Sequence, residues 1–130
     1  MSRPSTPEEL FAGHPLGLEL YRAVADAITA IAGGEPVEVR PTLSQVAFRR
    51  GRGFAYVWRP GQYLPSNVPA VLSIALPRKL ASRRIKQVAH PSNRVWMHHL
   101  ELHQVADVDD EVQGWLRDAF AAAGAGNAAG

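Results

Sequence analysis

The stretch QVAFRRGRGFAYVWR, residues 45–59, predicts the central element of the fold, a β-hairpin. Residues 45–49 and 54–59 alternate in side-chain character as β-strands do, and the glycine-rich segment 50–53 between them is a turn signal. A three-residue loop at 50–52 would pair Phe48 with Phe54 and Val46 with Tyr56. A two-residue turn would instead mix large and small side chains on both faces, so we favour the three-residue loop.

This register separates the side chains of the hairpin by size. The large ones would lie under the helices, together with alternate residues of a strand expected at 70–76: Val46, Phe48, Phe54, Tyr56 and Trp58, with Leu72, Ile74 and Leu76. The open face would have a floor of small residues with arginines at its edges: Ala47, Ala55 and Ser73, flanked by Arg49 and Arg59.

Helix signals lie on both sides of the strand region. Thr6-Pro7-Glu8-Glu9 matches a capping box and predicts a short helix that ends near Gly13. A longer helix follows from Pro15 to Gly33, with apolar residues at helical spacing. Asp107 or Asp109 is expected to cap the last helix.

Together these signals predict an α+β fold. We expect a five- or six-stranded antiparallel sheet with the N- and C-terminal helices packed on one face. Residues 1–120 would form a single domain, and the Ala/Gly-rich residues 121–130 a disordered tail.

Composition excludes several classes of protein. The 130-residue chain has no cysteine, which excludes disulfides, thiolate nucleophiles and cysteine-based metal sites. Its longest apolar run, residues 68–76, is far shorter than the roughly 20 residues that span a bilayer. The first ten residues do not have the pattern of a signal peptide, so we expect a cytoplasmic location and no membrane partner.

The net charge of +2 hides a segregation of charge along the chain. All twelve acidic residues lie at Glu38 or earlier, or at Glu101 or later. The segment between them is basic and carries Arg40, Arg49, Arg50, Arg52, Arg59, Arg78, Lys79, Arg83, Arg84, Lys86 and Arg94. Two interpretations remain open: the acidic ends fold over the basic centre and neutralise it, or the centre attracts an anionic partner.

The order of several segments along the chain is also informative. These segments are residues 11–15 (FAGHP), 44–50 (SQVAFRR), 53–58 (GFAYVW), 72–77 (LSIALP), 96–101 (WMHHLE) and 109–112 (DDEV). In this order they resemble domain of unknown function family 5655, in the form seen in actinobacterial proteins. The resemblance covers nearly the whole chain except the first few residues and the tail. It implies a small bacterial α+β domain, with no catalytic residues to carry over.

The histidines do not predict a metal site. His99, Glu101 and His103 alternate on one strand face, which places the two histidines about 13 Å apart, too far to share an ion. His98 points the other way and is expected to be a hydrogen-bonded core residue. We therefore expect no metal and no cofactor.

The sequence also lacks recognisable catalytic patterns. It has no nucleophile elbow, phosphate-binding loop or clustered carboxylates in its central strands, so we expect a protein that is not an enzyme. An enzyme that uses only Arg, His and Tyr is a third, unsupported alternative. The aromatic residues Phe48, Phe54, Tyr56, Trp58 and Tyr63 are typical of a core at alternate strand positions, although base-stacking platforms have similar patterns.

The function that these observations favour is a non-catalytic binding domain for an anionic partner. The partner would be nucleic acid or a small ligand with a phosphate or carboxylate group. We expect the anion to meet the hairpin tip and the open face at Arg49, Arg50, Arg52 and Arg59. The alternative is a protein-interaction or self-association module that uses the small-residue face and forms a homo-oligomer.

Overall fold

A computed structural model describes residues 6–62 and 65–129 of the chain. Two helices, α1 (Pro7–Leu10) and α2 (Pro15–Ala32), precede the strands, and α3 (Asp110–Ala129) follows them. The strands are β1 (Glu38–Pro41), β2 (Gln45–Arg50), β3 (Arg52–Trp58), β4 (Ala70–Leu76), β5 (Ile85–Ser92) and β6 (Val95–Leu102). Two 3-10 turns, η1 (Pro60–Gln62) and η2 (Val105–Asp107), complete the described elements.

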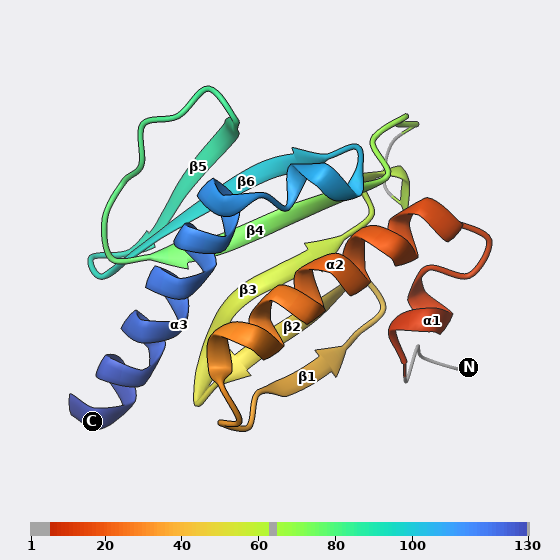
Figure 1. The fold of residues 1–130 in the computed structure, drawn as a ribbon. Coiled ribbons are helices and arrows are strands. Elements are labelled where there is room, and N and C mark those ends of the chain that lie inside the picture. Colours follow the sequence, from red (N-terminus) through yellow and green to blue (C-terminus); the bar gives the residue numbers. More distant parts are fainter. Residues whose placement is uncertain (1–5, 63–64, 130) are drawn as a thin grey trace.

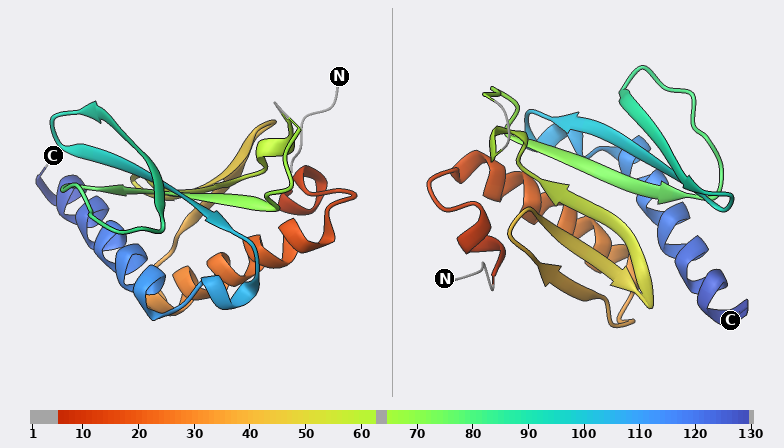
Figure 2. Two further views of the ribbon diagram at one scale, coloured as in Figure 1. Left: turned by 90° about the horizontal axis from the view of Figure 1, so that it is seen from above. Right: turned by 180° about the vertical axis from the view of Figure 1, so that it is seen from behind.

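The strands form one antiparallel sheet, six-stranded in the described part of the chain, in the order β1-β2-β3-β4-β6-β5 (Figure 1). The two long helices α2 and α3 lie on the same side of this sheet, and no helix of the described chain covers the other side (Figure 2). The predicted α+β class, with helices from both ends of the chain on one face, is confirmed.

The helix ends follow the capping signals of the sequence. The Thr6 hydroxyl accepts a hydrogen bond from the backbone N–H of Glu9 at 3.2 Å, as in a capping box. Asp109 caps α3, because its carboxylate accepts from the N–H of Val112 at 3.1 Å. Asp107 instead accepts from the N–H groups of His103 and Gln104, and so holds the turn before that helix.

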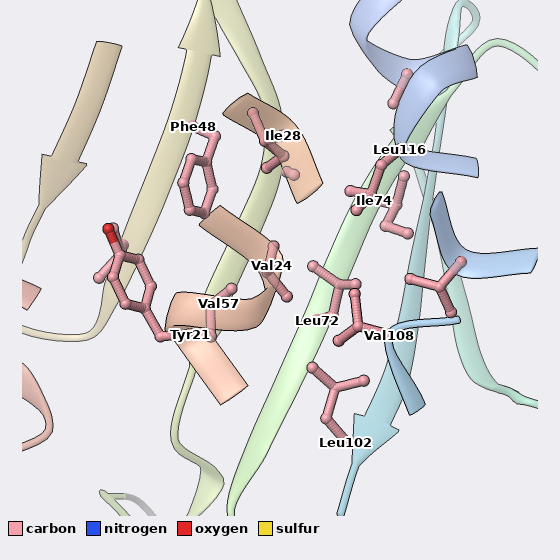
Figure 3. Close-up of a cluster of buried hydrophobic side chains, with 14 of the residues drawn as sticks. Tyr21, Val24, Ile28, Phe48, Val57, Leu72, Ile74, Leu102, Val108 and Leu116 are labelled. Carbon is pink, nitrogen blue, oxygen red and sulfur yellow. The ribbon is translucent and has the colours of Figure 1, made fainter. Parts of the chain in front are cut away.

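The core lies between the sheet and the two long helices. Val24 and Ile28 of α2 meet side chains of the central strands, and Leu116 of α3 packs beside them (Figure 3). The ring of Tyr21 stacks between Phe11 and Phe48, with centroid separations of 6.3 and 5.8 Å. A continuous apolar layer of this kind supplies most of the driving force for folding.

The predicted register of the β2–β3 hairpin is wrong by one residue over most of β3. Phe48 pairs with Ala55 rather than with Phe54, and Val46 pairs with Val57 rather than with Tyr56. The cause is a β-bulge: Phe54 is an extra residue in β3, and both Phe54 and Ala55 are buried in the core. Beyond the bulge the alternation is reversed, so the open face carries aromatic rings where small residues were expected.

The Ala/Gly-rich segment at the C-terminus belongs to α3, which continues to Ala129, into the stretch for which disorder is expected. Alanine has the highest helix propensity, and Ala119 and Ala123 are buried against the sheet layer. Among the described residues, no helix has the length and apolar character needed to cross a membrane.

Candidate binding site on the open face of the sheet

We use "open face" for the side of the sheet that faces away from α2 and α3. It is seen from behind in the right panel of Figure 2. The pairing of the four central strands places alternate residues of each strand there. These residues are Gln45 and Ala47 of β2, Tyr56 and Trp58 of β3, Val71, Ser73 and Ala75 of β4, and Met97, His99 and Glu101 of β6.

Three of these side chains form a hydrogen-bonded chain across β3, β4 and β6. The indole N–H of Trp58 donates to Ser73 Oγ at 2.9 Å, and Ser73 Oγ lies 2.6 Å from His99 Nδ1. The Trp58 and His99 rings meet edge to face, with centroids 6.2 Å apart. Because an indole N–H can only donate, Ser73 accepts from it and donates its own hydroxyl proton to His99.

This hydrogen bonding assigns the tautomer of His99. With Nδ1 accepting from Ser73, the proton of the neutral ring is on Nε2. Burial, with a smaller contribution from the adjacent His98, lowers the pKa of His99 below its ordinary value of 6.5 and keeps the ring neutral at pH 7. His99 therefore offers one N–H donor to a partner on the open face.

A hollow of about 460 Å³ lies over the centre of the open face, a size typical of small-ligand sites. Tyr56 and Trp58 line it together with Ser44, Gln45, Ser73, Met97 and His99. A second hollow of about 280 Å³, toward the hairpin tips, shares Tyr56 and Met97 with it. A third, of about 240 Å³, shares Trp58 and His99. The three hollows thus form a row, in which the two aromatic rings stand as partitions.

The position of the Tyr56 ring depends on a glycine. A Cβ atom at residue 53 would collide with the Tyr56 hydroxyl and ring, so the ring lies directly over Gly53. Covering a strand glycine with an aromatic ring is a known way of compensating for its missing side chain. Gly53 therefore holds Tyr56 flat against the sheet between the first two hollows.

Basic residues lie along the rim of this face. Glu38 pairs with both Arg40 and Arg49, so this corner retains a net positive charge. The hydrogen bond from Arg40 is the largest of the effects that lower the pKa of Glu38. Lys86 lines the third hollow and Arg94 the second. Neither of these two side chains forms an ion pair with any residue of the described chain.

The structure separates the four arginines that the sequence analysis groups together. Arg49 lies on the open face and donates to the carbonyl of Gly51 at 3.2 Å. Arg50 and Arg52 reach α3, where they donate to the carbonyls of Phe120 and Ala122 at 2.9 and 3.0 Å. Arg59 points the other way along the chain, and lines a hollow at the start of α2.

Arg50 also stacks on the Phe120 ring at 4.0 Å and pairs with Glu35 at 2.7 Å. Further acidic residues pair with the basic centre from the helix side, Asp118 with Arg78 and Asp109 with Arg84. Part of the central positive charge is thus neutralised by the ends of the chain, as one of the two interpretations holds. This pairing involves the helix layer and leaves the open face to its own charges.

Sequence reasoning missed the main residues of this site. Tyr56 and Trp58 were expected in the core, although their alternate spacing was recognised as compatible with stacking. His99 was considered only with His103, but it bonds Ser73, whereas His103 pairs with Glu101 at 3.0 Å. Tyr63 lies outside the described residues. Within the described residues, no three His, Asp or Glu side chains gather closely enough to hold a metal ion.

Comparison with known proteins gives one family. The model of "Domain of unknown function (DUF5655)" matches residues 8–123, from α1 through most of α3. No curated protein and no solved structure matches the chain. The family match spans the sheet, the helices that cover it and every residue of the open face. The chain therefore belongs to the DUF5655 family.

Proposed function

We propose that this domain is a non-catalytic binding module that holds an anionic partner on the open face of its sheet. The observation that carries the proposal is the distribution of charge around the row of hollows. Arg40, Arg49, Lys86 and Arg94 lie along this face and its ends, where the carboxylates are those of Glu38 and Glu101. The acidic residues of α1, α2 and α3 belong to the helix layer behind the sheet.

The arrangement of polar groups favours binding over covalent catalysis. Ser73 is only 3% exposed, and its hydroxyl already accepts from Trp58 and donates to His99. A nucleophilic serine needs an accessible oxygen that the reacting carbon can approach. Here the serine instead fixes two rings in place, which is a positioning role suited to a preformed binding surface.

The arginines expected from the sequence divide between two roles in this proposal. Arg49 contacts the partner directly, and Arg52 lines the second hollow beside Arg94. Arg50 holds the hairpin tip on α3 and so keeps the open face in register. The role of Arg59 as an anion contact remains a prediction of the sequence. A cytoplasmic location is part of the proposal, because phosphorylated small molecules and nucleic acids are found there.

A salt titration tests the proposal. Binding of labelled polyphosphate and of a labelled single-stranded oligonucleotide is measured by fluorescence anisotropy at several salt concentrations. We expect log affinity to fall linearly with log salt, with a slope of about −0.7 per neutralised phosphate for the single strand. Arg94→Ala with Lys86→Ala should weaken binding and make the slope shallower.

Arg117→Ala is the matched control, since Arg117 is exposed on α3 in the helix layer. It removes one positive charge far from the open face and should leave both affinity and slope almost unchanged. Absence of binding to either probe at low salt would refute the proposal, as would equal losses in the control. A dimer that Tyr56→Glu dissociates, without anion binding, would support self-association instead.

A further inference from the structure

We infer that the anionic partner is single-stranded nucleic acid, whose bases enter the row of hollows and stack on Tyr56 and Trp58. The inference rests on the proposed function and gives the open face a specific occupant. Its starting point is the bulge at Phe54, which turns the two largest aromatic side chains of β3 away from the core. Both rings are half-buried, so each retains surface for a partner.

The placement of the rings suits bases better than it suits a compact ligand. Tyr56 separates the second hollow from the central one, and Trp58 separates the central hollow from the third. Each ring thus borders space on two sides. The rings are two residues apart on one strand, or about 6.7 Å along it, so they serve successive positions of an extended partner.

Charge complementarity favours a chain of nucleotides over an isolated one. Arg94 lies at one end of the row and Lys86 at the other, with Arg49 along the side. A single phosphate contacts one of these positions, whereas a backbone that follows the row contacts several. Single-strand binding surfaces combine aromatic platforms with a positively charged track in this way. A duplex fits poorly, because its bases are already stacked on one another.

The central hollow also offers groups that can bond base edges. Gln45 supplies an amide, Ser44 a hydroxyl and His99 its Nε2–H donor. The Trp58 ring is already fixed by its hydrogen bond to Ser73, so little rotational freedom is lost when a base stacks on it. Glu101 beside the third hollow is the one feature that opposes a phosphate there, and its carboxylate pairs with His103.

The test compares oligonucleotide binding by the wild-type domain and by aromatic variants. The probes are labelled single-stranded DNA and RNA of about 12 nucleotides, within the site sizes of known single-strand modules. We expect Tyr56→Ala to weaken binding by about 5- to 150-fold, the loss of one stacked base, and Tyr56→Phe to restore most of it. Trp58→Leu should have a similar effect, and Glu101→Gln should tighten binding.

Trp96→Ala is the matched aromatic control. Trp96 is on β6 like His99, but it faces the helix side, stacked on His90 at 3.6 Å. Its removal should not change affinity for the oligonucleotide. Circular dichroism and thermal melts of every variant show whether the fold is retained. Because Tyr56 is half-buried on the open face, Tyr56→Ala should melt close to the wild type.

Three further probes separate failure of this inference from failure of the proposed function. A mononucleotide, a duplex of the same sequence and base-free polyphosphate should all bind more weakly than the single strand. If polyphosphate binds as tightly and Tyr56→Ala has no effect, the open face holds anions but does not stack bases, and this inference is overturned. If the mononucleotide binds as tightly as the oligonucleotide, the occupant is a small ligand. Binding by none of the probes would refute both.

Discussion

His98 and His99 are neighbours on β6, yet they lie on opposite faces of the sheet. His98 is fully buried on the helix side, where its Nε2 accepts from the N–H of Leu80 at 2.9 Å and its Nδ1–H donates to Ile74. His99 lies on the open face and bonds Ser73. His98 thus fixes the chain that leads from β4 to β5, a structural role that agrees with the expected core position.

The same contrast extends along the neighbouring strands. On the helix side, Ala55, Leu72 and Ile74 are fully buried among apolar side chains. On the open face, Trp58, Ser73 and His99 satisfy one another's polar groups and still border a hollow. The helix-covered face is therefore stabilised chiefly by apolar burial, whereas the open face is held in shape by directed hydrogen bonds. A surface of the second kind can exchange water for a partner without loss of the fold.

The largest effect that would break this comparison is a charge placed on each face. Ala55→Glu introduces a carboxylate without a partner into the core, and should cost about 4 kcal/mol or more, enough to unfold most of the protein. Ala75→Glu, on the open face opposite Met97, should cost much less. Urea denaturation of both variants measures the difference. Similar losses would mean that the open face is covered in solution.

Truncation of two adjacent residues of β4 gives a smaller contrast. Ile74→Ala should lower the free energy of unfolding by about 2–5 kcal/mol, because it opens a cavity under the helices. Ser73→Ala should lower it by about 1–2 kcal/mol, since it leaves the Trp58 N–H and the His99 nitrogen without their partner. Chemical denaturation checks both values. A loss for Ser73→Ala as large as that for Ile74→Ala would contradict the assignment of forces to the faces.

A third prediction concerns pH. Burial is the main effect that lowers the pKa of His98 below its ordinary value of 6.5, so the unfolded chain takes up a proton at a higher pH than the folded domain does. The stability that neutral His98 contributes is therefore fully present above about pH 6.5 and is lost as the pH falls toward the folded pKa. His99 acts in the same direction.

Melting temperatures between pH 7 and pH 5 measure this loss. Asp109 contributes in a lower range, because its hydrogen bonds with Arg84 hold its pKa below 3.8. His98→Gln retains a donor for Ile74 and an acceptor for Leu80 but does not titrate, so it should flatten the pH dependence. An unchanged slope in this variant would show that other groups carry it.

Much of the fold follows from local sequence. The capping box at Thr6, the αL glycine Gly33 after α2 and the alternation of β4 each depend on residues close to one another in the chain. For this reason the α+β class, the helix positions and the buried side of β4 were predictable from residue pattern alone. The buried position of His98 followed from the same alternation.

The open face depended on contacts that local sequence does not encode. Which of two neighbouring alanine–aromatic registers β3 adopts is decided by whether Phe54 packs on Phe120 of α3, at a centroid separation of 5.7 Å. That contact makes Phe54 the extra residue of the bulge, and one extra residue reverses the direction of every side chain after it. The sequence by itself determined the elements and their order; only packing against α3 decided that Tyr56 and Trp58 face outward.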